Sequence, residues 1–162
     1  MKNANIDSTV KPKHMKKAII IYNGLHFYLP LADKAFEWAK LRKCAVVALF
    51  LKIKNEPNPG YVFPSDIVAA ESLSTSKDAD ASDKLTIESC IKLLGHQAAT
   101  ENIAFSAILL IDPTSLEIEK QLLDCDAIFM QQTPEDLAHL PLAAVNIKEL
   151  LKDINVPVEF VQ

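Results

Sequence analysis

The chain has 162 residues, of which 49% are hydrophobic and 23% are charged. One ordinary globular domain has ~100 to 200 residues, so this length and composition exclude two independent cores, a disulfide scaffold and a disordered chain. The only glycines are Gly24, Gly60 and Gly95. Because phosphate-binding loops need clustered glycines, a glycine-rich phosphate loop is excluded as well.

The formal net charge is −4, although residues 1–17 contain five lysines and a single aspartate. The rest of the chain is therefore more acidic than the total, which disfavours binding to nucleic acid or to an anionic membrane. The three cysteines are widely spaced and form no CxxC pair, which indicates buried thiols in a reducing compartment. With no apolar run of ~18 residues and no apolar stretch of the secretory type, we expect a cytoplasmic protein without a membrane span.

The first half of the sequence predicts a flexible arm over residues 1–14 and then one domain over 15–162. A continuous apolar run predicts a buried strand at 18–22. A helix is expected to start at Pro30, because apolar residues recur at helical spacing from there, and a second buried strand is expected at 44–51. Residues 55–83 contain three prolines and Gly60 and then a stretch rich in Ser, Asp and Ala, so they are expected to form a long loop.

The second half continues the alternation of helices and strands. Helical spacing predicts a helix from Ile87 to about residue 102, and an apolar run predicts a strand at 105–111. Thr114 and Glu117 have the spacing of a capping box, so a helix is expected from there to about residue 124. A short strand at 127–130 is followed by a helix that begins near Thr133 and resumes through 147–154. The last strand, 156–161, contains a proline and is expected at a sheet edge.

Five strands that alternate with helices predict an α/β fold with a parallel sheet and helices on both faces, a three-layer sandwich. We expect the first strand at the centre and the strand order 3-2-1-4-5. In such sheets the ligand binds beyond the carboxyl ends of the strands, where the chain order reverses. That crevice would be lined by Asn23, Gly24, Gln131, Gln132 and Thr133.

Four segments in the correct order resemble the universal stress protein family, over roughly Lys16–Gln162. KAIIIYNG is similar to the family's first strand, and LADKAFEWAK is similar to its first helix. LLDCDAIFM and VPVEFV are similar to its fourth and last strands, with Asp126 at the shared aspartate. The resemblance implies a flavodoxin-like fold, of the kind also found in adenine nucleotide α hydrolases.

The resemblance is broken at the family's ATP-binding motif, which places glycines and a Ser or Thr after the fourth strand. The corresponding residues here are Gln131, Pro134, Ala144 and Val145, and the family's acidic residue at the end of the first strand is Asn23. Pro134 has no N–H to donate, a Cβ at Ala144 crowds the approach of a phosphate, and Val145 has no hydroxyl. We therefore expect a degenerate nucleotide site that does not bind ATP in the family's usual way.

Each candidate site residue also has a structural explanation. Asn23–Gly24 suits a turn as well as a ligand contact, and Gln131–Thr133 suits a capped helix as well as a polar or anionic ligand. Asp112 precedes a proline and Asp126 precedes a strand, so turn and structural roles are favoured over acid–base catalysis. The histidines have no metal-ligand spacing, so no metal site is expected.

The leading interpretation is a stress protein-like, non-catalytic binding or signalling module without a cofactor. One alternative is a protein that binds ATP or AMP through a remodelled phosphate site, with weak ATP hydrolysis. Another is a small-molecule sensor that uses the crevice at the strand ends. The resemblance implies a homodimer that pairs through the terminal strand, whose residues are Val156, Pro157, Val158, Glu159, Phe160 and Val161.

Overall fold

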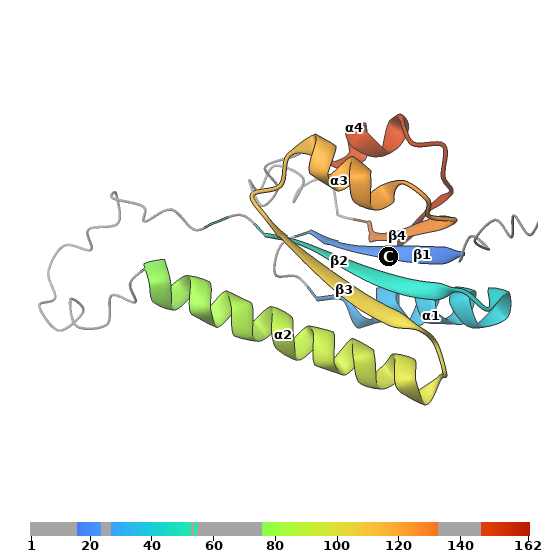
Figure 1. The fold of residues 1–162 in the computed structure, drawn as a ribbon, viewed down its shortest axis with the longest axis horizontal. Helices are drawn as coiled ribbons and strands as arrows, with labels where there is room; N and C mark the ends of the chain where they lie inside the picture. The colour runs from blue at the N-terminus through green and yellow to red at the C-terminus, as the bar shows by residue number, and fades with distance from the viewer. Residues whose placement is uncertain (1–15, 24–26, 53, 55–75, 133–146) are drawn as a thin grey trace, which may run out of the picture.

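The computed structural model describes residues 16–23, 27–52, 54, 76–132 and 147–162. Nine helices and strands alternate along these segments (Figure 1). Their bounds are β1 (Lys17–Asn23), α1 (Leu29–Arg42), β2 (Ala45–Lys52), α2 (Ser76–Thr100), β3 (Phe105–Ile111), α3 (Ser115–Leu122), β4 (Ala127–Gln131), α4 (Ile147–Lys152) and β5 (Val158–Val161).

The strands form one parallel sheet in the order β3-β2-β1-β4-β5, which confirms the predicted fold class and strand order. β1 lies at the centre, where Ile20 is in register with Ala48 of β2 and with Phe129 of β4. A strand covered on both faces must be apolar throughout, and the five residues of β1 from Ala18 to Tyr22 are all buried. The continuous apolar run in the sequence therefore indicated the central strand.

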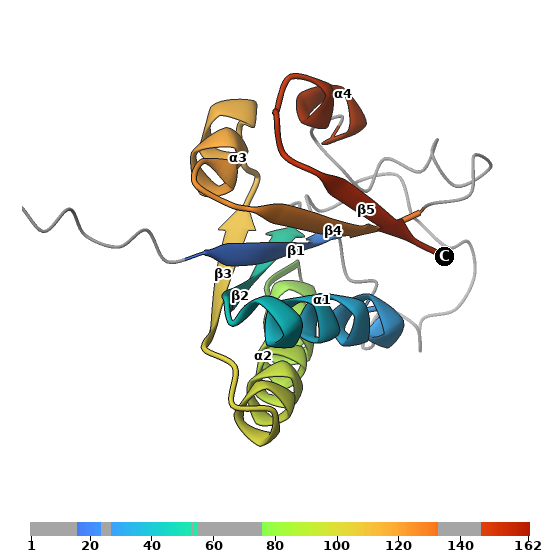
Figure 2. The same cartoon turned by 90° about the vertical axis from the view of Figure 1, so that its right-hand side faces the viewer.

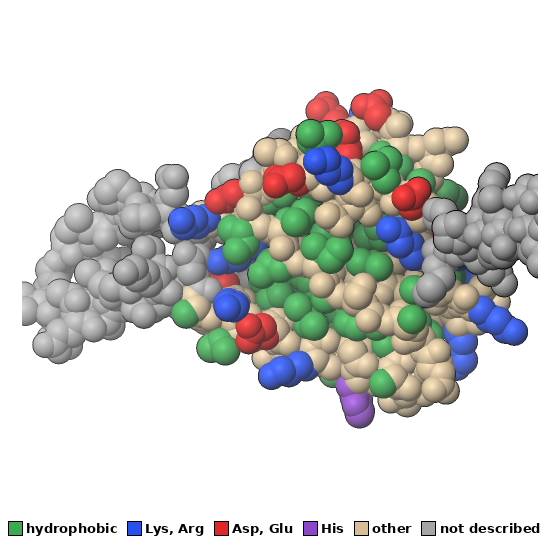
Figure 3. All heavy atoms as spheres, viewed as in Figure 1, with side chains coloured by type: hydrophobic (Ala, Val, Ile, Leu, Met, Phe, Trp, Pro, Cys, Tyr) green, Lys and Arg blue, Asp and Glu red, His purple; other side chains and the backbone are tan. Residues whose placement is uncertain are grey.

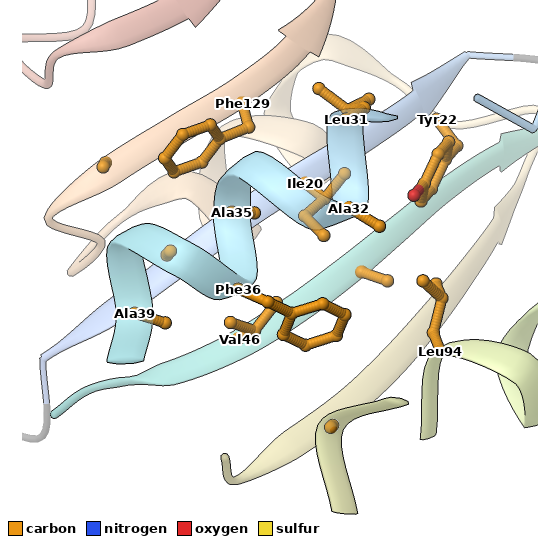
Figure 4. Close-up of a cluster of buried hydrophobic side chains, with 14 of the residues drawn as sticks. Ile20, Tyr22, Leu31, Ala32, Ala35, Phe36, Ala39, Val46, Leu94 and Phe129 are labelled. Atoms are coloured by element: carbon orange, nitrogen blue, oxygen red, sulfur yellow. The ribbon is translucent and has the colours of Figure 1, made fainter. Parts of the chain in front are cut away.

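Two of the described helices cover each face of the sheet, and each face has its own core (Figure 2). The α1/α2 core contains the even-numbered residues of β1, together with Phe36 of α1 and Leu94 of α2 (Figure 4). The α3/α4 core contains the odd-numbered β1 residues Ile19 and Ile21, together with Ile118 of α3 and Leu150 of α4. Successive residues of β1 therefore point alternately into the α1/α2 core and the α3/α4 core.

The ends of α1 and α3 follow local sequence signals. Pro30 occupies the first turn of α1, where its missing N–H is not needed, and Lys43 ends the helix in the left-handed conformation with φ of 51°. At α3 the predicted capping box is present: Glu117 N donates to Thr114 Oγ1 at 3.3 Å, and Thr114 N donates to Glu117 Oε2 at 2.8 Å. The Glu117 carboxylate accepts hydrogen bonds from Thr114 N and, at 2.9 Å, from the Thr114 hydroxyl, and these two bonds hold the pKa of the carboxyl below its ordinary value.

The predicted loop over residues 55–83 is wrong at its carboxyl end, because α2 begins at Ser76 rather than near Ile87. The first turns of α2 project beyond the sheet (Figure 1), and their sequence has no apolar periodicity that would indicate a helix. The predictions for the arm at 1–14, for the rest of the loop and for a helix start near Thr133 lie outside the described residues.

The last strand is confirmed as a sheet edge, but it begins at Val158 rather than at residue 156. Pro157 has no N–H for the ladder, although its carbonyl accepts a hydrogen bond of 2.9 Å from Ile128 N. The proline therefore sets the start of β5.

Candidate functional site

The structure brings three of the predicted site residues to the same edge of the sheet. Asn23 ends β1 and Gln131 ends β4, and these strands are neighbours with Ile21 in register with Met130. Gln132 directly follows β4. Gly24, Thr133 and the motif positions Pro134, Ala144 and Val145 lie outside the described residues.

The sheet separates the side chains of Asn23 and Gln131. Asn23 is in register with Leu51, which belongs to the α3/α4 core. Gln131 is in register with Val161, which belongs to the α1/α2 core. Register partners in a parallel sheet project to the same face, so the side chains of Asn23 and Gln131 leave the sheet on opposite faces.

The side chain of Gln132 is already engaged by the end of the chain. Gln162 Nε2 donates to Gln132 Oε1 at 3.1 Å, and Gln132 N donates to the carbonyl of Val161 at 2.8 Å. Tyr28, next to the start of α1, donates its hydroxyl to the carbonyl of Gln162 at 2.6 Å. These bonds link α1, β4 and β5 at the carboxyl ends of the strands and leave Gln132 with less capacity for a ligand.

Asn23 and Gln131 retain their hydrogen-bonding capacity. Both are half-buried, and neither side chain forms a hydrogen bond with another described residue. An amide side chain offers a carbonyl acceptor and two N–H donors but no charge. This part of the edge therefore suits uncharged polar groups better than a phosphate, which needs N–H clusters or cations.

A second polar group lies at the carboxyl ends of β2 and β3, and the sequence analysis missed it. Lys52 is only 6% exposed, and its Nζ lies 3.4 Å from Asp83 Oδ2 on α2. Asp112 has φ of 47° and accepts a hydrogen bond of 2.8 Å from Lys54 N through its side chain, so it links the chain after β3 to the chain after β2. A lysine directly after a long apolar run was the only sequence signal for a buried cation at this position. Nothing in the sequence identified Asp83 as its partner.

The Tyr22 hydroxyl is buried in the α1/α2 core and has no hydrogen-bond partner among the described residues. Its ring packs near those of Phe27 and Phe50, with centroids 5.2 and 5.0 Å away. Figure 4 shows Tyr22 beside α1 and the central strands. Burial is the main cause that raises the pKa of this hydroxyl well above its ordinary value, and the nearby Cys90 and Asp33 act in the same direction. Tyr22 therefore stays neutral and is not available as a base.

We expect the substitution Tyr22→Phe to leave the free energy of unfolding unchanged at neutral pH or to raise it by about 1 kcal/mol, because the hydroxyl is desolvated without a partner. The folded state holds the phenolic proton more tightly than the unfolded state, so wild-type stability falls as the pH rises above ~10. The variant lacks this contribution. Urea unfolding at neutral and alkaline pH measures both effects, and a loss above ~1 kcal/mol in the variant would contradict the first.

The remaining titratable candidates have structural roles or are isolated. Asp126 accepts a hydrogen bond of 2.8 Å from Lys17 N, which joins the chain before β4 to the start of β1. His96 is exposed on α2. Within the described segments no three His, Cys, Asp or Glu side chains lie close enough to hold a metal ion. Burial is the main cause that raises the pKa of the thiols of Cys44, Cys90 and Cys125, so none of these is an activated nucleophile.

No protein-family model matches the sequence, and no curated protein matches it significantly. Solved structures do match. A universal stress protein family member from Burkholderia pseudomallei aligns with a TM-score of 0.55 and 12% identity, over 93% of this chain and 98% of that one. UspA from Lactobacillus plantarum aligns with a TM-score of 0.55 and 13% identity, over 93% and 99% of the two chains. The chain has the universal stress protein fold.

A third structure with this fold, a universal stress protein in complex with cAMP, aligns with a TM-score of 0.53 and 10% identity, over 92% of this chain and 98% of that one. The universal stress protein fold thus extends over nearly the whole chain, as the four resembling segments implied. None of the helices that the structure describes is both long and apolar enough to cross a membrane.

Proposed function

We propose that the chain is a divergent universal stress protein that works as a non-catalytic binding or signalling module and does not hold ATP in the family's usual way. The observation that carries the proposal is that glutamine side chains, rather than glycines, occupy the end of β4. Gln131 and Gln132 stand where the ATP-binding motif begins, and Gln132 is tied to Gln162 at 3.1 Å. Side chains thus occupy the start of a segment that, in ATP-binding members, brings bare main chain to the phosphates.

The absence of catalysis is supported by the roles of the acidic residues at the strand ends. Asp112 and Asp126 each accept a backbone hydrogen bond that shapes a turn or joins two strands. The buried cation of Lys52 is paired with Asp83. A general acid or base needs free access to the proton it transfers, and these groups are engaged within the fold.

Isothermal titration with ATP and with AMP, each at millimolar concentration, tests the proposal. We expect no heat of binding from the wild type. The matched control is Asn23→Asp, which restores the family's charge at the end of β1 and leaves the four motif positions changed. We expect no gain of binding in this variant, because the charge alone does not create a phosphate site. Submicromolar binding of ATP to the wild type would refute the proposal.

A second candidate is a nucleotide-binding protein with a remodelled phosphate site. It is favoured by the cAMP complex of a protein with the same fold and by the amides of Asn23 and Gln131 at the strand ends, which form no hydrogen bond with another described residue. Mass spectrometry of the small molecules released when the purified protein is denatured separates the candidates. A stoichiometric adenine nucleotide would favour the second candidate, and its absence favours the first.

We also propose that the module is a homodimer. The sequence-based hypothesis places the contact at the terminal strand, and β5 does lie at one edge of the sheet with Phe160 44% exposed. The opposite edge is β3. The outward backbone groups of either edge strand could form hydrogen bonds with a strand of a second copy. Which edge forms the dimer contact therefore depends on the side chains of β3 and β5.

A further inference from the structure

β3 forms an apolar edge with no strand on its outer side among the described residues. Its sequence, FSAILLI, contains no charged residue and no proline, and each of its seven residues is at least partly exposed. Hydrophobic side chains gather over β3 between α2 and α3 on the face shown in Figure 3. Edge strands in soluble proteins are usually protected by charges, prolines or short length, and β3 has none of these protections.

The hydrogen bonds at the two ends of β3 show which of its backbone groups point outward. Val46 N donates to the carbonyl of Ala104 at 2.9 Å, and Asp112 N donates to the carbonyl of Lys52 at 2.8 Å. In a parallel ladder, alternate residues bond to the same neighbour. The even-numbered residues therefore face β2, and the outward N–H and C=O groups belong to Phe105, Ala107, Leu109 and Ile111.

We propose that this edge pairs antiparallel with β3 of a second copy of the chain, around a two-fold axis at Ile108. In this register Phe105 lies opposite the second copy's Ile111, and Ala107 lies opposite its Leu109. The outward residues of both copies then exchange hydrogen bonds, about eight in all. The interface is isologous, because the same residues serve on both sides.

The side chains in this register match a second copy and carry no electrostatic cost. Ile108 meets its own counterpart, Ser106 lies opposite Leu110, and Asp112 beyond the strand lies opposite Ala104, so no like charges face each other. A strand from another protein would have to supply the same length of uncharged residues, which the second copy already has. A second copy of the chain is thus the partner that the residues of β3 favour.

The same reasoning disfavours β5. The carbonyls of Pro157 and Val161 accept hydrogen bonds from Ile128 N and Gln132 N, so the outward groups of β5 belong to Val158 and Phe160. The antiparallel register that pairs these two residues with each other puts Glu159 directly opposite Glu159 of the second copy, where like charges repel. β5 is also only four residues long and follows a proline, so it has the protections that β3 lacks.

The proposal rests on the homodimer proposed above but not on any ligand, and sedimentation velocity of the full chain tests it across a range of concentrations. We expect the wild-type mass to approach twice the 17.9 kDa of one chain as the concentration rises. Ile108→Lys, which places two ammonium groups on the axis, and Ala107→Pro, which removes an outward N–H, should both give a mass of one chain. Circular dichroism checks that each variant folds.

Two matched controls separate the edges and the effect of added charge. Leu41→Lys adds the same charge at a site on α1 that is 76% exposed, and Val158→Lys adds it to β5. We expect both to keep the wild-type mass. A wild type that stays monomeric overturns the homodimer itself. A dimer that survives Ile108→Lys, or that is lost in Val158→Lys, keeps the homodimer and overturns the assignment to β3.

A cross-linking variant tests the register directly. Opposed residues of a non-hydrogen-bonded antiparallel pair have Cα atoms ~4.5 Å apart, within the range of a disulfide. Mild oxidation of Ile108→Cys should therefore give a covalent dimer on a non-reducing gel. Ile111→Cys should not, because it faces Phe105 rather than itself. Equal cross-linking of both variants, or none in Ile108→Cys, would overturn the register.

Discussion

Substitution of Asp83 with asparagine is expected to lower the free energy of unfolding by about 3 kcal/mol. The carboxylate lies 3.4 Å from the ammonium of Lys52, which is 6% exposed, and it connects α2 to the end of β2. The variant keeps the size of the side chain and removes its charge, so the buried cation loses a desolvated partner. Urea unfolding followed by circular dichroism measures the loss.

A double-mutant cycle with Lys52→Met provides the control. Methionine replaces the cation with an apolar chain of similar length, so Lys52→Met should cost less than Asp83→Asn. The double variant should cost less than the sum of the two single variants, because both remove the same interaction. Additive losses would show that Lys52 and Asp83 act independently.

Substitution of Phe36 with alanine is expected to lower the free energy of unfolding by about 4 kcal/mol. Phe36 is completely buried where α1 meets the sheet (Figure 4). Its ring centroid lies 6.1 Å from that of Phe105 on β3. Removal of the ring leaves a cavity that the neighbouring elements cannot fill, since the sheet and both helices are fixed by other contacts. Thermal and urea unfolding should both show the loss.

The matched control for Phe36→Ala is Leu41→Ala on the same helix. Leu41 is 76% exposed, so its truncation should change the free energy of unfolding by no more than ~0.5 kcal/mol. Similar losses in both variants would mean that the effect comes from the helix and not from the core.

The strand order and most of the elements could be predicted because their signals are local. The fully apolar stretch from Ala18 to Tyr22 indicated a central strand, and the spacing of Thr114 and Glu117 indicated the start of α3. The parallel arrangement followed from the alternation of helices and strands, because only right-handed crossovers join parallel neighbours well. These features need no knowledge of distant contacts.

The parts that could not be predicted depend on contacts between residues far apart in the chain. No local pattern connects Lys52 with Asp83, or Tyr28 with Gln162, although both pairs shape the ends of the strands. The start of α2 was missed because its first turns extend beyond the sheet and have no apolar periodicity. Asn23 and Gln131 were grouped correctly by topology, but their opposite orientation depends on the register at the last residue of each strand.

This opposite orientation restricts the shape of any molecule that binds at the carboxyl ends of β1 and β4. A compact metabolite can reach the amide of Asn23 or that of Gln131, but not both, since the thickness of the backbone stands between them. Simultaneous recognition would require an elongated compound that bends over the strand tips. A ligand library for this protein should therefore contain both small compounds with one polar group and long compounds with a polar group at each end.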